Sequence, residues 1–317
     1  MKKSLQFILL LFIFSCKPSA TVTVDTKSNS VTASEVKETV AFLASNDLLG
    51  RDTGSEGIEE AATYLEKQFK SFGLKPYFET YRDNFKVADS DAFNVVGYIE
   101  GSDAKLKDEF IIVGAHYDHI GYSNVVENDS IANGANDNAA GTAGVVALAK
   151  YFANAKTNKR SVMFVLFSAE EKGLLGSKHL SEKLKAENFN LYNMFNIEMI
   201  GLPMKDKNYK AYLTGHKMSN MSDKFNEYLA DSNFIGLYEM AETYQLFKRS
   251  DNYPFYLDFK VPSQTLSTSD DYIYYHQSGD EIDKLDYEHM ANITNKLIII
   301  IEKMSQSPTK EIILNNE

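Results

Sequence analysis

The sequence has a single cysteine, Cys16, and no tryptophan. Because this cysteine precedes the body of the chain, we exclude catalysis by a cysteine and zinc sites made of thiolates. The sequence also lacks an excess of basic residues, since 33 Lys and Arg stand against 44 Asp and Glu and the formal net charge is −11. That charge opposes nucleic-acid binding and favours a well-solvated surface.

Several common catalytic motifs are missing as well. We find no H-E-x-x-H zinc motif, no G-x-x-x-x-G-K-[ST] phosphate loop and no G-x-S-x-G nucleophile elbow. These absences exclude the zincin, P-loop and serine-hydrolase patterns. The residues that indicate a catalytic function are instead histidines and carboxylates spread over several short segments.

The first fifteen residues are typical of a secretory signal. Two lysines precede ten mostly apolar residues, 5–14, a run too short to span a bilayer. Cys16 follows at the expected cleavage point, so we expect a bacterial lipoprotein that is exported and held in the cell envelope by a lipid on Cys16. An ordinary signal peptide with an incidental cysteine is the alternative. Residues 16–31 are typical of a flexible tether, and residues 32–317 of a single domain.

Five short segments carry side chains of the types that bind zinc. They are HYDH at 116–119, GANDNAAG at 134–141, SAEE at 168–171, NIEMIG at 196–201 and YYHQSGD at 274–280. Three of these segments end continuous apolar runs of strand length, which are typical of strands buried on both faces of a sheet. Because ligands of open α/β sheets bind where the strands end, we expect these polar side chains to lie close together.

Partners for some of these side chains follow from geometry. Side chains at positions i and i+2 of an extended chain share a face, so Asp118 can orient the ring of His116. The adjacent carboxylates of Glu170 and Glu171 repel each other unless a positive charge lies between them. Glu198 needs a partner because a carboxylate at the end of an apolar strand is costly without one.

Each of these residues also has an ordinary structural role when it is taken alone. A strand-end or loop histidine, a helix-capping carboxylate and a solvated acidic helix start are all common. Glu198 could likewise pair with a lysine or arginine at the sheet edge. We favour one shared site because five separate coincidences would have to meet at a single sheet edge.

The order and spacing of the motifs resemble those of the co-catalytic zinc exopeptidases, peptidase family 28 of the metallo class. This family includes bacterial leucyl aminopeptidases, glutamate carboxypeptidases and glutaminyl cyclases. The resemblance covers roughly residues 32–303 and rests on H-x-D after a strand, G-A-x-D-N-x-x-G before a helix, S-A-E-E-x-G-L-L-G-S, N-x-[DE]-M-x-G and a late His followed by Asp. GRDTGSEG at 50–57 and RSDNYPF at 249–255 are also similar to the family.

The resemblance implies a zinc site with two ions expected and one possible. The metal ligands that it implies are His116, Asp137, Glu171, Glu198 and His276. Asp137 would bridge the two ions, and in one partition His116 and Glu198 share one ion with it while the other two ligands share the second. Glu170 would be the general base, and Asp118 would support His116.

Two details of the family pattern bear on this sequence. Members tend to have a cis peptide bond after the bridging aspartate, which would be Asp137–Asn138 here. The position of Glu198 is more often an aspartate in the aminopeptidases. Since glutamate is one methylene longer and this ligand lies near the substrate's amine, Glu198 could displace the second metal or alter recognition of the amine.

The alternation of apolar runs and helical patterns predicts an α/β fold with three layers, α/β/α, around a central mixed, mostly parallel sheet. Strands are expected near 77–85, 93–100, 110–116, 161–167, 191–198, 209–214 and 261–267. Helices are expected from a capping box at Thr32 to about residue 44, from 55 to 72, and near 140–155, 173–186, 218–230, 250–258 and 286–304.

Three functions remain open. The resemblance favours a metallo-exopeptidase, an aminopeptidase or dipeptidase that hydrolyses peptides with a metal-bridged hydroxide. A glutaminyl-peptide cyclotransferase on the same fold is the second, although its relatives usually have a Trp where this chain has Tyr275. A non-catalytic binding lipoprotein of the envelope is the third, but it would be marked by the loss of Glu170 or of a ligand, and none is lost.

Overall fold

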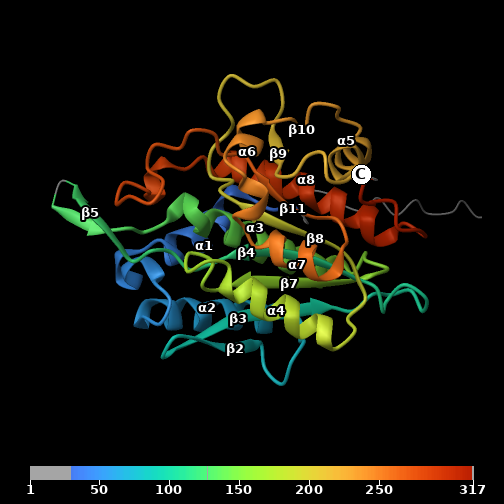
Figure 1. The fold of residues 1–317 in the computed structure, drawn as a ribbon, viewed down its shortest axis with the longest axis horizontal. Coiled ribbons are helices and arrows are strands. Elements are labelled where there is room, and N and C mark those ends of the chain that lie inside the picture. The colour runs from blue at the N-terminus through green and yellow to red at the C-terminus, as the bar shows by residue number, and fades with distance from the viewer. Residues whose placement is uncertain (1–29, 127, 316–317) are drawn as a thin grey trace, which may run out of the picture.

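The computed structural model describes residues 30–126 and 128–315. The expected signal sequence, Cys16 and nearly all of the tether lie outside the described residues. A mixed sheet runs through the molecule, and helices cover both of its faces (Figure 1). Among the described residues, no helix is long and apolar enough to cross a membrane.

The strands and helices are distributed along the whole described chain. The main sheet consists of β1 (Lys75–Pro76), β2 (Arg82–Val87), β3 (Ser90–Ile99), β4 (Phe110–His116), β7 (Ser161–Phe167), β8 (Leu191–Glu198), β9 (Ala211–Leu213), β10 (Ile235–Gly236) and β11 (Ser263–Ser267). A separate hairpin consists of β5 (Tyr122–Val126) and β6 (Asp129–Ile131). The helices are α1 (Ala33–Leu43), α2 (Glu56–Phe72), α3 (Gly141–Ala155), α4 (Leu175–Ala186), α5 (Met221–Leu229), α6 (Glu239–Thr243), α7 (Asn252–Phe259) and α8 (Tyr287–Gln306).

The centre of the sheet is parallel. β7, β4, β8 and β11 are neighbours in that order and run in one direction. β3 joins β7 antiparallel at one side, and β9 joins β11 antiparallel at the other. The mixed α/β/α fold predicted from the sequence is therefore confirmed, with parallel pairing concentrated in the central strands that carry the candidate site.

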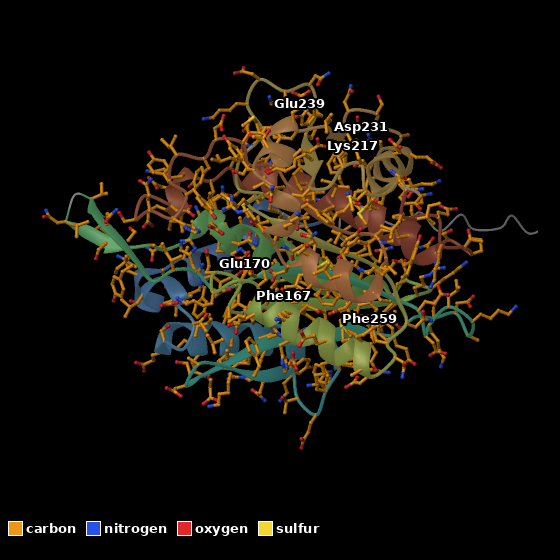
Figure 2. All side chains as sticks on the ribbon, viewed as in Figure 1. Phe167, Glu170, Lys217, Asp231, Glu239 and Phe259 are labelled. Atoms are coloured by element: carbon orange, nitrogen blue, oxygen red, sulfur yellow. The ribbon has the colours of Figure 1, made fainter. Side chains whose placement is uncertain are left out.

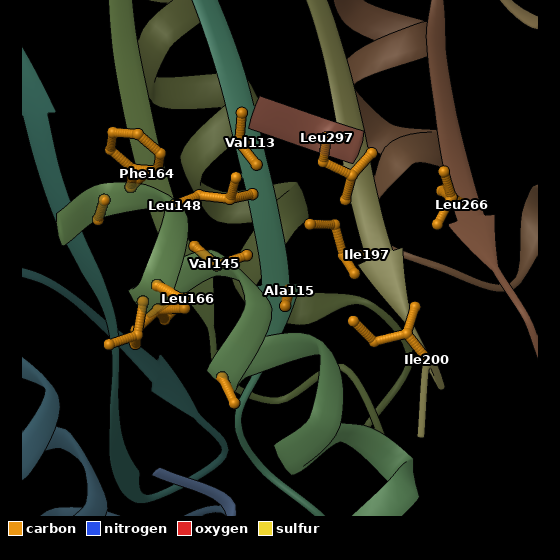
Figure 3. Close-up of a cluster of buried hydrophobic side chains, with 14 of the residues drawn as sticks. Val113, Ala115, Val145, Leu148, Phe164, Leu166, Ile197, Ile200, Leu266 and Leu297 are labelled. Atoms are coloured by element: carbon orange, nitrogen blue, oxygen red, sulfur yellow. The ribbon is translucent and has the colours of Figure 1, made fainter. Parts of the chain in front are cut away.

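The central strands are buried on both faces. Along β4, Val113 packs into one hydrophobic cluster while Ile112 packs into a second cluster on the opposite face, as the alternation of side chains along a strand requires. Figure 3 shows Val113 and Phe164 from the sheet in one cluster with Val145 and Leu148 of α3 and Leu297 of α8. α1, α2, α3 and α8 form this layer, and α4 and α7 pack on the other face.

The predicted capping box at the start of α1 is confirmed. The backbone N–H of Glu35 donates to the Thr32 hydroxyl at 3.3 Å, and the Glu35 carboxylate accepts the Thr32 N–H at 3.0 Å. Glu35 also accepts a hydrogen bond from Lys150 of α3 at 2.5 Å. The first helix is thus tied to the helix that follows the GANDNAAG segment.

A few elements differ from the sequence prediction. The strand expected over 77–85 begins only at Arg82, because Tyr77 packs edge-on against the rings of Phe78 and Tyr98 instead of joining a ladder. The hairpin of β5 and β6, which projects from the body at the left of Figure 1, was not predicted, nor was the short helix α6.

Candidate metal centre

The carboxyl ends of three parallel strands carry most of the predicted site residues. His116 is the last residue of β4, and Glu198 is the last residue of β8. Glu170 and Glu171 follow three and four residues after the end of β7. In Figure 2, Glu170 lies near the middle of the molecule beside Phe167, the final residue of that strand.

Asp137 lies between two histidines. It lies in the segment Ala135–Ala140, where its own backbone angles (φ −108°, ψ 93°) are not helical, and this segment leads into α3. Its Oδ1 is 3.3 Å from Nε2 of His116, and its Oδ2 is 3.3 Å from Nε2 of His276. His276 is in addition 3.1 Å from the Glu171 carboxylate. Each oxygen of Asp137 therefore faces a different histidine, which is the arrangement that a carboxylate bridging two cations requires.

Glu198 lies on the same side of the sheet edge as Asp137 and Glu171, next to a cavity that all three line. It lines the cavity together with Asp137 and Glu171, and one of its oxygens accepts a hydrogen bond from the hydroxyl of Ser250. Ser250 in turn accepts a hydrogen bond from Asn196 at 2.9 Å. Among the described residues no lysine or arginine forms an ion pair with Glu198, so the alternative of a sheet-edge salt bridge is not found.

Glu170 differs from its neighbour Glu171. Within the described chain, its carboxylate is in none of the contacts below 4 Å between histidine nitrogens and carboxylates, whereas Glu171 contacts His276 and His119. Burial raises the pKa of Glu170 well above its usual range, the His116 ring opposes that rise, and the carboxylate of Glu198 adds to it. Glu170 is therefore a carboxyl group of the cavity that stands outside these histidine contacts and has a raised affinity for a proton, as a general base requires.

Asp118 supports the site in a different way from the one predicted. Nδ1 of His116 lies 3.2 Å from the backbone carbonyl oxygen of Asp118, but 3.7 Å from its carboxylate, which is too long for a hydrogen bond. The carboxylate of Asp118 instead accepts the backbone N–H groups of Glu170 and Glu171 at 3.2 and 3.3 Å. Asp118 thus orients His116 through its main chain and holds the SAEE segment through its side chain.

Sequence reasoning assigned no role to His119, although it is the last residue of the HYDH segment. Its ring is fully buried, and Nδ1 lies 3.0 Å from Glu171 and 3.8 Å from Asp137. His119, Asp137, Glu171 and His276 offer donor atoms that all lie within 4.8 Å of one another. The type and place of His119 in the motif were visible in the sequence, but the loop that turns its ring inward was not.

The YYHQSGD segment also fixes the backbone around Asp137. The carboxylate of Asp280 accepts the N–H groups of Asn136 and Asp137 at 2.8 and 3.0 Å, and it accepts the hydroxyl of Tyr272 at 2.7 Å. The peptide bond between Asp137 and Asn138 is cis, as the family resemblance implied. Asp280 therefore fixes the backbone of the GANDNAAG segment through these two hydrogen bonds.

A buried arginine joins the segments on either side of the site. Arg51 has no exposed surface and donates to the carbonyl oxygens of Tyr117, Asn133 and Gly134 at 2.8, 2.6 and 3.1 Å, and also to that of Leu43. Burial lowers the pKa of Arg51 to about 10, while carboxylates of the site raise it. It remains a cation at neutral pH and fixes the backbone next to His116 and before Asp137.

The electrostatics of the cluster call for further positive charge. Burial lowers the pKa of His276, but its contacts with Asp137 and Glu171 outweigh burial and raise that pKa to about 10. Oδ2 of Asp137 and Nε2 of His119 are buried without a hydrogen-bond partner among the described residues. A largely buried set of imidazoles and carboxylates without thiolates suits zinc. The residues present therefore fit a divalent metal centre.

A cavity of about 340 Å³ opens beside the cluster. Its walls include the carboxylates of the site and several aromatic and apolar side chains. These aromatic and apolar wall residues are Met199, Tyr212, Tyr238, Tyr244, Leu246, Tyr272 and Tyr275. The size and the mixture of an apolar wall with a few converging polar groups are typical of a small-molecule or peptide-end site.

Comparison of the sequence with models of protein families identifies the family of this chain. The model described as peptidase family M28 matches residues 94–300, more than half of the chain. The chain belongs to peptidase family M28. All five predicted metal ligands, as well as Glu170 and Asp118, fall within the matched residues.

Two curated relatives agree with that membership. A probable zinc metalloprotease of Pyrenophora tritici-repentis is 28% identical over 179 residues, which cover 53% of this chain and 40% of the relative. A probable leucine aminopeptidase of Arthroderma otae is 25% identical over 272 residues, covering 81% of this chain and 68% of that protein. This chain thus spans about two fifths of the length of the first relative and two thirds of the second.

The fold is also similar to solved structures. The crystal structure of Legionella pneumophila LapA aminopeptidase matches with a TM-score of 0.69 at 18% identity, over 93% of this chain and 78% of that chain. At this identity the likeness shows the fold alone. Family M28 therefore accounts for both the fold and the motifs, while the particular reaction has to be argued from the site.

Proposed function

We propose that this M28 chain is a zinc-dependent exopeptidase of the aminopeptidase type, which hydrolyses the first peptide bond of its substrates. The observation that carries the proposal is Asp137, which turns one oxygen to His116 and the other to His276 in a cavity that also holds the free carboxylate of Glu170. The names of the relatives, a zinc metalloprotease and a leucine aminopeptidase, support the metal and the reaction.

The proposed roles follow the positions of the side chains. The residues that would hold zinc are His116, Asp137, Glu171, Glu198 and His276. Bound zinc would polarise the scissile carbonyl and lower the pKa of an attacking water. Glu170 would accept the proton from that water on its carboxylate and return it to the leaving amine, a contribution of typically ~10²–10⁴-fold in rate.

The cavity also offers a place for a free amino terminus. A protonated amine is a cation, and Glu198 presents a carboxylate to the cavity beside Glu170. The aromatic wall, which includes the buried Tyr212 and Tyr238 with ring centroids 4.7 Å apart, would hold the side chain of the first residue. These contacts support an aminopeptidase or dipeptidase over an endopeptidase.

The test of the base is the substitution Glu170→Gln. We expect turnover of aminoacyl anilides to fall by at least ~10²-fold, while the zinc content and the unfolding midpoint stay unchanged, because Glu170 is not placed as a ligand. Glu182→Gln, at an exposed position on α4, is the matched control and should keep full activity. Loss of zinc together with activity in Glu170→Gln would instead place Glu170 among the metal ligands.

The test of the reaction type uses three substrates with one enzyme preparation. We expect release of the first residue from a free tripeptide and none from the same peptide after N-acetylation, because acetylation removes the positive charge that Glu198 would bind. A peptide with an N-terminal glutamine serves as the third substrate. Cyclisation of that peptide without hydrolysis of the others would replace the proposal with a glutaminyl-peptide cyclotransferase.

We further propose that the protein is exported and held at a bacterial envelope membrane by a lipid on Cys16. The support is the sequence alone, in which Cys16 follows an apolar run of ten residues. The substitution Cys16→Ser in the full chain should move the protein from the membrane fraction to the soluble fraction. Unchanged membrane association in that variant would rule out the lipid anchor.

A further inference from the structure

His119 occupies the side of the metal centre that faces His276. The two rings are 5.5 Å apart between centroids, and both approach the Glu171 carboxylate, with nitrogen–oxygen distances of 3.0 Å for His119 and 3.1 Å for His276. Nδ1 of His119 also lies 3.8 Å from Oδ2 of Asp137, the same oxygen that faces His276. Two histidines and two carboxylates therefore converge on one space.

The distances within this group are close to those of a four-coordinate zinc site. Four donors placed at ~2.0–2.2 Å from zinc in a tetrahedron lie roughly 3.3–3.6 Å from one another. The four separations in the structure are 3.0, 3.1, 3.3 and 3.8 Å. A histidine that only supported Glu171 from outside would approach that carboxylate alone, whereas Nδ1 of His119 faces Asp137 as well.

The fold holds the His119 ring firmly in this place. The backbone N–H of His119 donates to the carbonyl oxygen of Arg51 at 3.3 Å. Gly134 lies directly against the ring, since a Cβ at that position would be only 2.6 Å from Cγ of His119. Gly134 has a φ of +57°, in the left-handed region that favours glycine. Both neighbours belong to segments that also position the predicted ligands.

We propose that His119 is a fourth protein ligand of the ion held by Asp137, Glu171 and His276. The coordination site of this ion would then be closed, with four protein donors, as structural zinc sites usually are. The ion on the other side of Asp137 would have only His116 and Glu198 in addition, and it would keep an open position. The inference rests on the metal centre of the proposed function but not on its peptidase activity.

The assignment makes the two sides of the centre unequal. The closed site should bind its ion more tightly, and the open site should be the one that takes water and substrate. Glu170 lies on the open side, because it lines the cavity together with Glu198, whereas His119 and His276 are not part of the cavity wall. The base and the open position are therefore on the same side of Asp137.

The first test uses the unmodified protein, stripped of metal and reloaded with one equivalent of Zn²⁺. X-ray absorption at the zinc edge should show two imidazoles, from His119 and His276, in a four-coordinate site. A single imidazole at one equivalent would overturn the proposal, because the tight site would then lack His119. The measurement needs no variant, so a folding defect cannot obscure the result.

The second test measures the affinity for the first zinc ion by competition with a chelator. We expect both His119→Ala and His119→Asn to weaken it by more than ~100-fold, beyond the 10–100-fold that is typical of residues outside the ligand set. Asparagine keeps a hydrogen-bond donor for Glu171, so recovery of affinity in His119→Asn to within ~10-fold of the wild type would show a supporting residue and overturn the proposal. His179→Ala, on α4 and outside the cavity, is the control and should keep the wild-type affinity.

The two proposals fail in different ways. Tight zinc with two imidazoles in a protein that cleaves no peptide would remove the peptidase function and leave His119 as a ligand. Peptidase activity in a protein whose tight zinc site has only one imidazole would keep the peptidase function and remove His119 from the ligands. The zinc-edge spectrum and the peptide assay, made on the same preparation, therefore separate them.

Discussion

Arg51 offers a direct test of how this metal centre is held together. The substitution Arg51→Met replaces a buried guanidinium with an apolar side chain of similar length. In the structure Arg51 donates to four backbone carbonyl oxygens, including those of Tyr117 in the HYDH segment and Gly134 in the GANDNAAG segment. We expect the variant to lose both stability and affinity for metal, because these carbonyls hold the loops that carry the ligands.

The magnitude can be worked from the contacts. The carbonyl of Gly134 keeps a second donor, the N–H of Ala139 at 3.2 Å, so at most three carbonyls lose their donor. A buried polar group left without a partner costs ~1–3 kcal/mol. Local relaxation and entry of water reduce the sum, and we expect the free energy of unfolding to fall by about 3–5 kcal/mol, as it does when one partner of a buried charged network is removed.

The assay is denaturant unfolding of the metal-free protein, followed by zinc titration of the folded variant. Arg160→Met is the matched control, because Arg160 is equally buried and donates to backbone carbonyls of Met304 and Ser307, but it precedes β7 at the far end of the strand. It should lower stability without changing zinc affinity. The reasoning about Arg51 would be refuted by a loss of less than ~1 kcal/mol, or by equal losses of zinc affinity in the two variants.

Three further predictions follow from other contacts. Asp280→Asn should weaken zinc binding without altering the ligand set, because it removes the negative charge from the acceptor of the Asp137 backbone N–H. The zinc affinity, determined by competition with a chelator, measures this effect. Glu198→Ala should abolish metal binding at the site proposed to include it, and Glu198→Asp should weaken that binding less, as metal analysis would show. Burial raises the pKa of Glu35, but Lys150 and the Thr32 contacts outweigh burial and lower it. These contacts of the ionised Glu35 therefore stabilise the fold fully above the usual pKa of glutamate, and that stabilisation is lost as the pH falls through the lowered pKa. Glu35→Gln should therefore make the free energy of unfolding depend less steeply on pH in the acidic range, as denaturant unfolding at several pH values would show.

Much of the fold could be predicted because its central strands are apolar and continuous. The predicted strands at 110–116, 161–167 and 191–198 coincide with β4, β7 and β8. A strand buried on both faces leaves a clear signal in the sequence, and the polar residue at its end is equally clear. The sequence therefore predicts His116 and Glu198 at the sheet edge, and in the structure they are the last residues of the neighbouring strands β4 and β8.

The rest depends on loops, where the sequence carries no periodic pattern. His119 is turned inward by the bend after β4, and nothing in the order of residues indicates which way its ring points. Arg51 lies in a segment whose similarity to the family was noted, but its four carbonyl partners come from three separate parts of the chain. The exposed hairpin of β5 and β6 has no buried face to leave an alternating pattern.

Glu198 illustrates how a departure from the family pattern is accommodated by its surroundings. The longer side chain reaches the hydroxyl of Ser250, which is itself held by Asn196, two residues earlier on the same strand. Residues at i and i+2 share a face of a strand, so Asn196 and Glu198 both point toward Ser250. The extra methylene of Glu198 is therefore matched by an anchor for its carboxylate. An aspartate here would sit farther from Ser250 and leave its hydroxyl without that acceptor, which is why restoring the commoner family residue should weaken this metal site and not improve it.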